Sequence, residues 1–193
     1  MNRLQKYIYF TIGTIILGMG IALCVASGFG TDPLSVLVNG INYRTGISMS
    51  ASNAIVCAAM ILVGLVMDRK DVTLATVISL FASSIGISIM EAVLPQEPGL
   101  LARGIFMAAG ICAYTFGTAM SQIPQIGYST YDVFIYSLSN IFHTDTYHAL
   151  RWIADGSFLI AGWILGGTAG FGTIVIVVCA GKFVEYWMKL LKH

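Results

Sequence analysis

The residues best suited to chemistry lie where two short helices are predicted to begin. Asp32 follows two glycines in Ser27-Gly-Phe-Gly-Thr-Asp-Pro-Leu-Ser35, and its carboxylate can accept the free N–H groups of a helix that starts at Pro33. Such N–H groups attract anions, whereas the charge of Asp32 itself favours a cation or a proton. The pattern predicts either a plain helix cap or a substrate or ion site that includes Gly30, Thr31, Asp32 and Ser35.

A second segment, 97 positions later, has the same design. In Ile126-Gly-Tyr-Ser-Thr-Tyr-Asp132 a glycine again precedes a helix start, with Ser129 as the predicted N-cap and Asp132 three residues further on. Gly127, Ser129 and Asp132 therefore join the candidate ligands. The same shift pairs Gly30 with Gly127, Gly13 with Gly110, Gly20 with Gly117, Ala22 with Ala119 and Thr76 with Thr173. We interpret the chain as two related halves.

Asp155 is the third acidic candidate, about two turns into an apolar segment and one turn after Arg151. A carboxylate deep in a bilayer costs about 2.5–3.5 kcal/mol, so it should face the protein interior and find a partner. Arg151 is the obvious one. Asp155 is then either half of a structural ion pair near the membrane surface or a relay for a proton or cation.

Other ionisable residues have simpler explanations. Glu185 has Lys182 and Lys189 at helical spacing, which favours a local ion pair. Glu91 has no local base, and we expect it either to reach the interface or to meet Asp32 or Arg44. The segment that contains His143, Asp145 and His148 is predicted to be a hydrated loop rather than a metal site.

Composition places the chain in a membrane. Apolar residues make up 57% of the 193 residues and charged residues 10%, with a mean hydropathy of +0.83. A net charge of +1 gives no basic face for nucleic acid. The four cysteines stand singly in apolar runs, and we expect them to pack rather than react. No nucleophile elbow, P-loop or zinc motif is present, so we expect no enzyme, cofactor or metal.

The hydrophobic pattern predicts an all-α polytopic membrane protein with six transmembrane helices, each close to the roughly 20 residues that a span needs. The spans cover about 7–26, 48–67, 72–94, 101–123, 149–165 and 173–191, with short capped or re-entrant helices at about 34–43 and 130–142. Residues 1–193 form a single membrane domain, with repeats at about 7–94 and 101–191.

The distribution of Lys and Arg predicts the orientation in the membrane. Both termini are expected in the cytoplasm, because the basic residues gather at that side: Arg3, Lys6, Arg69, Lys70, Arg151, Lys182, Lys189 and Lys192, against Arg44 and Arg103 outside. Three spans in each half then make the two repeats inverted, a plan in which transporters bind substrate where the repeats meet.

The stretch from Gly20 to Ser35, Gly-x-Ala-Leu-x-Val-x-Ser-Gly-Phe-Gly-Thr-Asp-Pro-x-Ser, resembles the signature of the YczE/YyaS/YitT family of bacterial membrane proteins. The run Gly-Gly-x-x-Gly-Phe-Gly-Thr that ends at Thr173 is also similar to that family. In the second segment, 126–132, only Gly127 and Asp132 match the residues that family members often have there. The role of Ser129 and Thr130 is therefore open. The resemblance covers nearly the whole chain and implies a bacterial cell membrane protein of similar length, without a settled activity.

Three functions are compatible with these observations. The first is a carrier for a small solute, with its site between the two short helices and with Asp155 as a relay. The second is the substrate-binding membrane subunit of a multipart importer of the energy-coupling-factor type. The third is an accessory protein for membrane assembly or export. The expected partners are the bilayer and an unknown small solute, with a homo-oligomer or a partner membrane complex left open.

Overall fold

The computed structural model describes residues 1–67, 72–95, 98–142 and 147–192, without the side chains of residues 141, 142, 147 and 148. This part of the chain is helical and contains no strand. Its helices are α1 (Arg3–Ser27), α2 (Pro33–Thr45), α3 (Met49–Met67), α4 (Leu74–Val93), α5 (Leu100–Gln122), α6 (Thr130–Phe142), α7 (Tyr147–Ile164) and α8 (Phe171–Leu191).

The all-helical prediction is confirmed, and every predicted helix lies within a few residues of an observed one. Four helices, α1, α3, α4 and α5, are long and apolar enough to cross a membrane by length and composition. Helices α7 and α8 occupy the predicted fifth and sixth spans but are not among these four, and α7 carries Arg151 and Asp155. The count of six spans therefore stays a prediction.

Helices α1 and α5 cross in close contact at glycines. A Cβ atom placed on Gly20 would lie 2.3 Å from the backbone nitrogen of Tyr114, and one on Gly117 would lie 2.4 Å from that of Leu17. Gly13 likewise meets the backbone of Gly117. Small residues allow this approach, which gives packing energy that lipid cannot supply through the hydrophobic effect.

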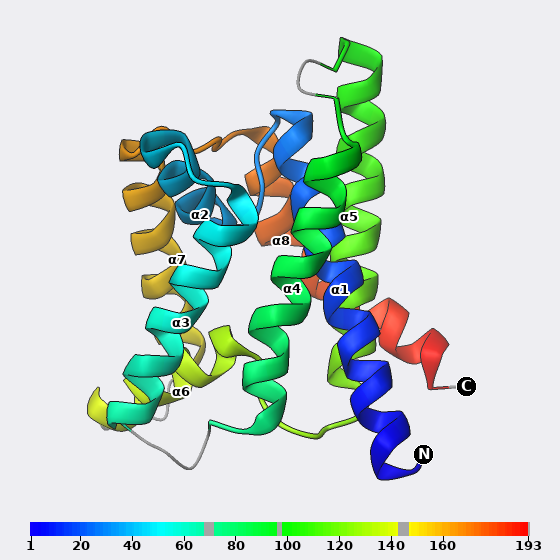
Figure 1. The fold of residues 1–193 in the computed structure, drawn as a ribbon, viewed down its shortest axis with the longest axis vertical. Helices are drawn as coiled ribbons and strands as arrows, with labels where there is room; N and C mark the ends of the chain where they lie inside the picture. Colours follow the sequence, from blue (N-terminus) through cyan, green and yellow to red (C-terminus); the bar gives the residue numbers. More distant parts are fainter. Residues whose placement is uncertain (68–71, 96–97, 143–146, 193) are drawn as a thin grey trace.

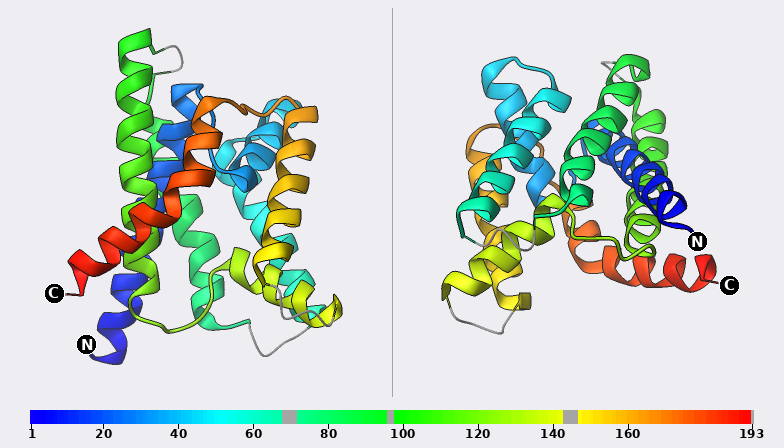
Figure 2. Two further views of the ribbon diagram at one scale, coloured as in Figure 1. Left: turned by 180° about the vertical axis from the view of Figure 1, so that it is seen from behind. Right: turned by 60° about the horizontal axis from the view of Figure 1, so that its bottom comes forward.

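Two groups of helices result from the packing (Figure 1). In the axial group, α1 packs on α4 and α5, and α5 packs on α8. In the flanking group, α2 packs on α3 and α7, and α6 packs on α3 and α7. The contact of α3 with α4 is the main join between the groups. In the part of the chain described, α7 and α8 make no comparable contact, and they diverge along their length (Figure 2).

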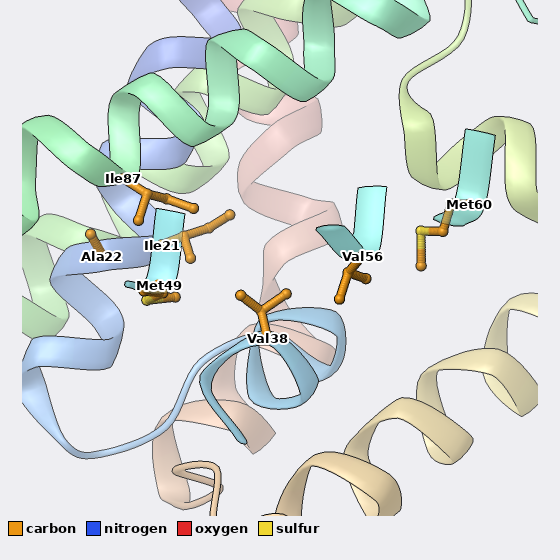
Figure 3. Packing of buried hydrophobic residues seen from close by; sticks show 7 residues of the cluster. All are labelled: Ile21, Ala22, Val38, Met49, Val56, Met60 and Ile87. Atoms are coloured by element: carbon orange, nitrogen blue, oxygen red, sulfur yellow. The ribbon is translucent and has the colours of Figure 1, made fainter. Parts of the chain in front are cut away.

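The hydrophobic core lies where the first four helices converge. Seven buried residues form it: Ile21, Ala22, Val38, Met49, Val56, Met60 and Ile87 (Figure 3). Val38 comes from the short helix α2, so α2 is inserted among the long helices rather than lying on their surface. Aromatic side chains of the second half, including Tyr114, Tyr131 and Phe158, pack against this cluster.

The two ends of the molecule carry different elements. The N- and C-termini lie at the same end, and α2 and α6 lie near opposite ends (Figure 1). Several residues used to predict orientation or loop chemistry lie outside the described residues, namely Arg69, Lys70, His143 and Asp145. The predictions that depend on them stay predictions.

Candidate functional site

The start of α2 has the predicted capped geometry. The backbone N–H of Ser35 donates to Oδ2 of Asp32 at 3.2 Å, and Pro33 occupies the first turn. The hydroxyl of Thr31 donates to the other carboxylate oxygen at 3.3 Å. Asp32 is only 9% exposed, so this cap is buried within the bundle. The preceding Gly30 has a φ of +109°, which L residues rarely adopt, and this allows the sharp entry into the helix.

The start of α6 contributes an aromatic side chain to the interior. The hydroxyl of Tyr131 donates to Oδ1 of Asp155 on α7 at 2.5 Å, a short bond of the kind that a charged acceptor gives. The guanidinium of Arg151, one turn earlier on α7, lies 5.1 Å from the centroid of the Tyr131 ring. Tyr131 therefore contacts both charged side chains of α7.

These groups meet beside α5, in what we call the acidic junction: Asp32, Tyr114, Tyr131, Arg151 and Asp155. Asp32, Arg151 and Asp155 all act electrostatically on Tyr114, and Asp32 and Asp155 act on each other. Asp32 from the start of α2 and Tyr131 from the start of α6 both belong to this group, whereas the substrate or ion site expected from the sequence stays a prediction.

The walls of the junction are aromatic and apolar. The ring of Phe158, one turn after Asp155 on α7, lies 6.4 Å from that of Tyr131 and 5.8 Å from that of Phe134. Apolar rings of this kind screen a nearby charge less than water does.

The other predicted site residues are placed differently. The hydroxyl of Ser129 donates to Oδ2 of Asp132 at 2.8 Å and accepts from the Asp132 N–H at 3.3 Å, which is the predicted capping arrangement. The neighbouring Thr130 is fixed to α4, because its N–H donates to the hydroxyl of Ser79 at 3.1 Å. Asp132 thus bonds Ser129, whereas its neighbour Tyr131 is the residue that α6 contributes to the acidic junction.

The two predicted glycine turns interlock the halves of the chain. A Cβ atom on Gly30 would lie 2.4 Å from Oγ1 of Thr173 at the start of α8, and one on Gly127 would lie 2.3 Å from Oγ1 of Thr73 just before α4. Each turn therefore packs against the last long helix of the other half.

Glu91 has a role that the sequence did not indicate. Its carboxylate on α4 accepts the backbone N–H groups of Met49 at 2.7 Å and Ser50 at 3.1 Å, which caps the start of α3. Below this cap, the side-chain amide of Asn53 donates to the hydroxyls of Ser83 at 3.1 Å and Ser84 at 3.0 Å. From the sequence we expect Glu91 to reach the interface or to meet Asp32 or Arg44. The partners of its carboxylate are instead the free N–H groups at the start of α3.

Tyr114 is the junction residue that sequence reasoning missed. It lies inside the apolar α5, with no charge or turn nearby to single it out. Its position four residues after Gly110, on the face that meets α1, is the one signal that places it toward the interior. Within the described residues, no group of three His, Cys, Asp or Glu side chains could hold a metal ion.

A hollow of about 390 Å³ separates α7 from α8 near the junction. Its lining is mainly apolar and consists of Leu159, Ile160 and Trp163 on α7 together with Ala169, Gly170, Thr173 and Ile174 at the start of α8. Leu159 lies one turn after Asp155. Gly170 and Thr173 are the residues against which Gly30 packs, two positions before Asp32. The lining therefore includes a residue one turn from Asp155 and residues that pack against the turn before Asp32.

Long apolar helices that enclose acidic side chains define a helical membrane protein with a charged interior. The chain belongs to the family described as a family of unknown function (DUF6198), whose model matches residues 4–189.

Relatives of the chain agree with this assignment. YyaS of Bacillus subtilis, an uncharacterised protein, is 26% identical over 98% of this chain and 95% of its own length. YczE of Bacillus subtilis, an uncharacterised membrane protein, is 20% identical over 94% and 84%. An uncharacterised protein of Haemophilus influenzae is 28% identical over 91% and 80%. No solved structure matches the chain. The resemblance to YczE and YyaS noted from the sequence is confirmed.

Proposed function

We propose that this protein is a membrane carrier for a small, positively charged organic solute, which binds at the acidic junction. The observation that carries the proposal is the placement of Asp32 and Asp155, which come from different halves of the chain, close enough for their charges to interact. A buried negative charge is costly in a membrane, and a bound cation would compensate it.

The aromatic walls favour an organic cation over a small hydrated ion. Tyr131 already holds the guanidinium of Arg151 against its ring, which is the interaction that quaternary ammonium groups make with aromatic side chains. The adjoining hollow is mainly apolar and could receive the apolar part of such a solute. Neither the rings nor the hollow would replace the hydration shell of an inorganic ion.

An inverted repeat of six spans, with α7 and α8 as the fifth and sixth, is part of this proposal. Gly13 contacts Gly117 and Gly20 contacts Gly110, whereas the shift of 97 residues pairs Gly13 with Gly110 and Gly20 with Gly117. A two-fold axis between α1 and α5 accounts for these crossed contacts. Under such symmetry Gly13 meets Gly117, the counterpart of Gly20, and Gly20 meets Gly110, the counterpart of Gly13. The interlocked turns at Gly30 and Gly127 support the same relation.

We place the protein in the bacterial cell membrane with both termini in the cytoplasm. The termini lie at one end of the molecule, and the positive charges of Arg3, Lys6, Lys189 and Lys192 are close to them in the chain (Figure 1). Short basic segments favour the cytoplasmic side. A membrane location is also what the name of YczE states for that relative.

The test compares two probes of nearly the same shape, phenyltrimethylammonium and its neutral isostere tert-butylbenzene. We expect the cation to raise the melting temperature of the purified protein in detergent and the isostere to leave it unchanged. Asp32→Asn and Asp155→Asn should each abolish the stabilisation, because each removes a charge from the junction. Asp132→Asn, a matched change outside the junction, should keep it. Equal stabilisation of all four proteins would contradict the assigned site.

No stabilisation of the wild-type protein by the cation would contradict a cation site as such. The second and third functions named from the sequence would then gain weight. Co-purification with a partner complex from bacterial membranes would separate those two functions from a carrier that acts alone.

A further inference from the structure

We propose that the structure shows one of two access states, in which the hollow between α7 and α8 is the open entrance to the acidic junction. The seam between α3 and α4 is the closed counterpart of that entrance. The inference rests on the proposed carrier function and adds the route that the solute takes and the residues that hold the other route shut. By the seam we mean Met49, Asn53, Cys57 and Ile61 on α3 with Leu80, Ser83, Ser84 and Glu91 on α4.

The seam is closed over most of the length of both helices. At one end Glu91 accepts two N–H groups from the start of α3, and in the middle Asn53 bonds two serine hydroxyls of α4. Further along, Cys57, Ile61 and Leu80 form a buried apolar cluster. Polar bonds and apolar packing therefore both join the flanking group to the axial group at this seam.

The equivalent positions between α7 and α8 lack these groups. A shift of 97 residues places Leu150 at the position of Asn53 and Met188 at that of Glu91, and it replaces Ser83 and Ser84 by Ala180 and Gly181. No side chain at these four positions can form the hydrogen bonds of the seam. The hollow lies between the same two helices, nearer the turn that joins them, and its walls Trp163 and Ile174 are well exposed.

The lining of the hollow reaches close neighbours of the junction residues. On α7 it begins at Leu159, one turn beyond Asp155, and on α8 it includes Thr173, which packs against Gly30. A cation with an apolar body can place that body in the hollow while its charge meets the carboxylates. The flanking group would then rock against the axial group, so that the hollow closes while the seam parts, as inverted-repeat transporters do around a fixed site.

Disulfide cross-links directly test this exchange between the two states, in which the hollow closes as the seam opens. The background protein has Cys24, Cys112 and Cys179 replaced by alanine, while Cys57 is retained for the seam pair with Leu80→Cys. The hollow pair is Trp163→Cys with Ile174→Cys, made with Cys57 also replaced by alanine. Diamide, which enters membranes, serves as oxidant, and flux is measured as uptake of phenyltrimethylammonium into proteoliposomes.

We expect the cross-linked seam to bind the cation as well as the uncross-linked protein does, but to lose at least nine-tenths of the flux, which dithiothreitol should restore. Unchanged flux through the cross-linked seam would overturn the inference. The hollow pair should cross-link slowly, and several-fold faster when Glu91→Ala loosens the seam. Glu185→Ala, a matched change on α8, should leave that rate unchanged.

The outcomes keep this inference apart from the proposed function. If the uncross-linked protein shows no flux, the carrier function fails, and the exchange is judged from cross-linking rates alone. If Glu91→Ala does not change the cross-linking rate of the hollow pair, the proposed exchange between the two states is overturned as well. If flux is present but insensitive to the seam cross-link, the carrier stands and the assigned route is wrong.

Discussion

The pair α3 and α4 differs from the pair α7 and α8, although the two pairs occupy corresponding places in the chain. On one side, α3 and α4 are joined by the bonds of Asn53 and Glu91 and by a buried apolar cluster. On the other, α7 and α8 are separated by the hollow. Around both sides, the crossing of α1 and α5 and the interlocked glycine turns follow the same pattern in each half.

This difference separates the residues that determine how the helices pack from the residues that determine which pair of helices is closed. Glycines at corresponding positions make the shared frame, because they allow backbones to touch. In the proposed mechanism, Asn53 and Glu91, which have no polar counterpart at the corresponding positions of the second half, decide which side is closed. A frame of this kind can adopt two arrangements of nearly equal energy when only a few hydrogen bonds separate them, each worth about 0.5–1.5 kcal/mol.

The largest expected effect comes from breaking the frame that both sides share. Gly117→Leu places a side chain where a Cβ atom would already lie 2.4 Å from the nitrogen of Leu17, so α1 and α5 must separate. We expect a loss of stability of about 3 kcal/mol or more and little monodisperse protein by size-exclusion chromatography. Gly104→Leu, also on α5, adds its side chain where no atom lies within 4 Å of the new Cβ, and this variant should purify as the wild type does.

An intermediate effect should come from the seam alone. Asn53→Ala removes one buried and one partly buried hydrogen bond to α4, and we expect it to cost about 1–3 kcal/mol in the free energy of unfolding. Denaturant unfolding in detergent measures this cost. Ser157→Ala on α7 removes an exposed bond to its own helix and should change stability by less than about 0.5 kcal/mol. Equal effects of the two changes would remove the distinction between a closed and an open side.

The smallest effect should come from filling the hollow. Ala169→Leu adds apolar volume to its lining, and we expect the melting temperature to rise slightly, by the equivalent of about 0.5–1 kcal/mol, while uptake of the cation slows. Ala108→Leu, at an exposed position of α5, should change neither. Faster uptake by Ala169→Leu would show that the hollow is not an entrance.

Much of the fold could be predicted from the sequence, because long apolar runs and the glycine and proline signals mark where helices start and end. The caps at Asp32 and Ser129 depend on residues two or three positions away, so local chemistry determines them. The cap of α3 by Glu91 joins residues more than 40 positions apart, and no local pattern encodes it. Tyr114 was missed for the same reason, since its role depends on which helix faces α5.

The convergence of Asp32 and Asp155 was predicted in kind but not in detail. The cost of a charge in a membrane requires an interior partner, which the sequence indicates for Asp155. That one partner is the hydroxyl of Tyr131 depends on how α6 meets α7. In the proposed repeat, the open side between α7 and α8 follows from hydrogen-bonding side chains that are lacking at the positions corresponding to Asn53 and Glu91. The sequence did not single out these positions, because only the contacts of α3 with α4 show what the two side chains do.

Counterflow of phenyltrimethylammonium in proteoliposomes tests the central claim most directly. Vesicles that contain the wild-type protein are loaded with unlabelled cation and diluted into a trace of labelled cation. A carrier with a site at the acidic junction should accumulate label transiently, and Asp155→Asn should abolish the accumulation whereas Asp132→Asn should retain it. The same low uptake in loaded vesicles, unloaded vesicles and vesicles without protein would contradict the carrier function.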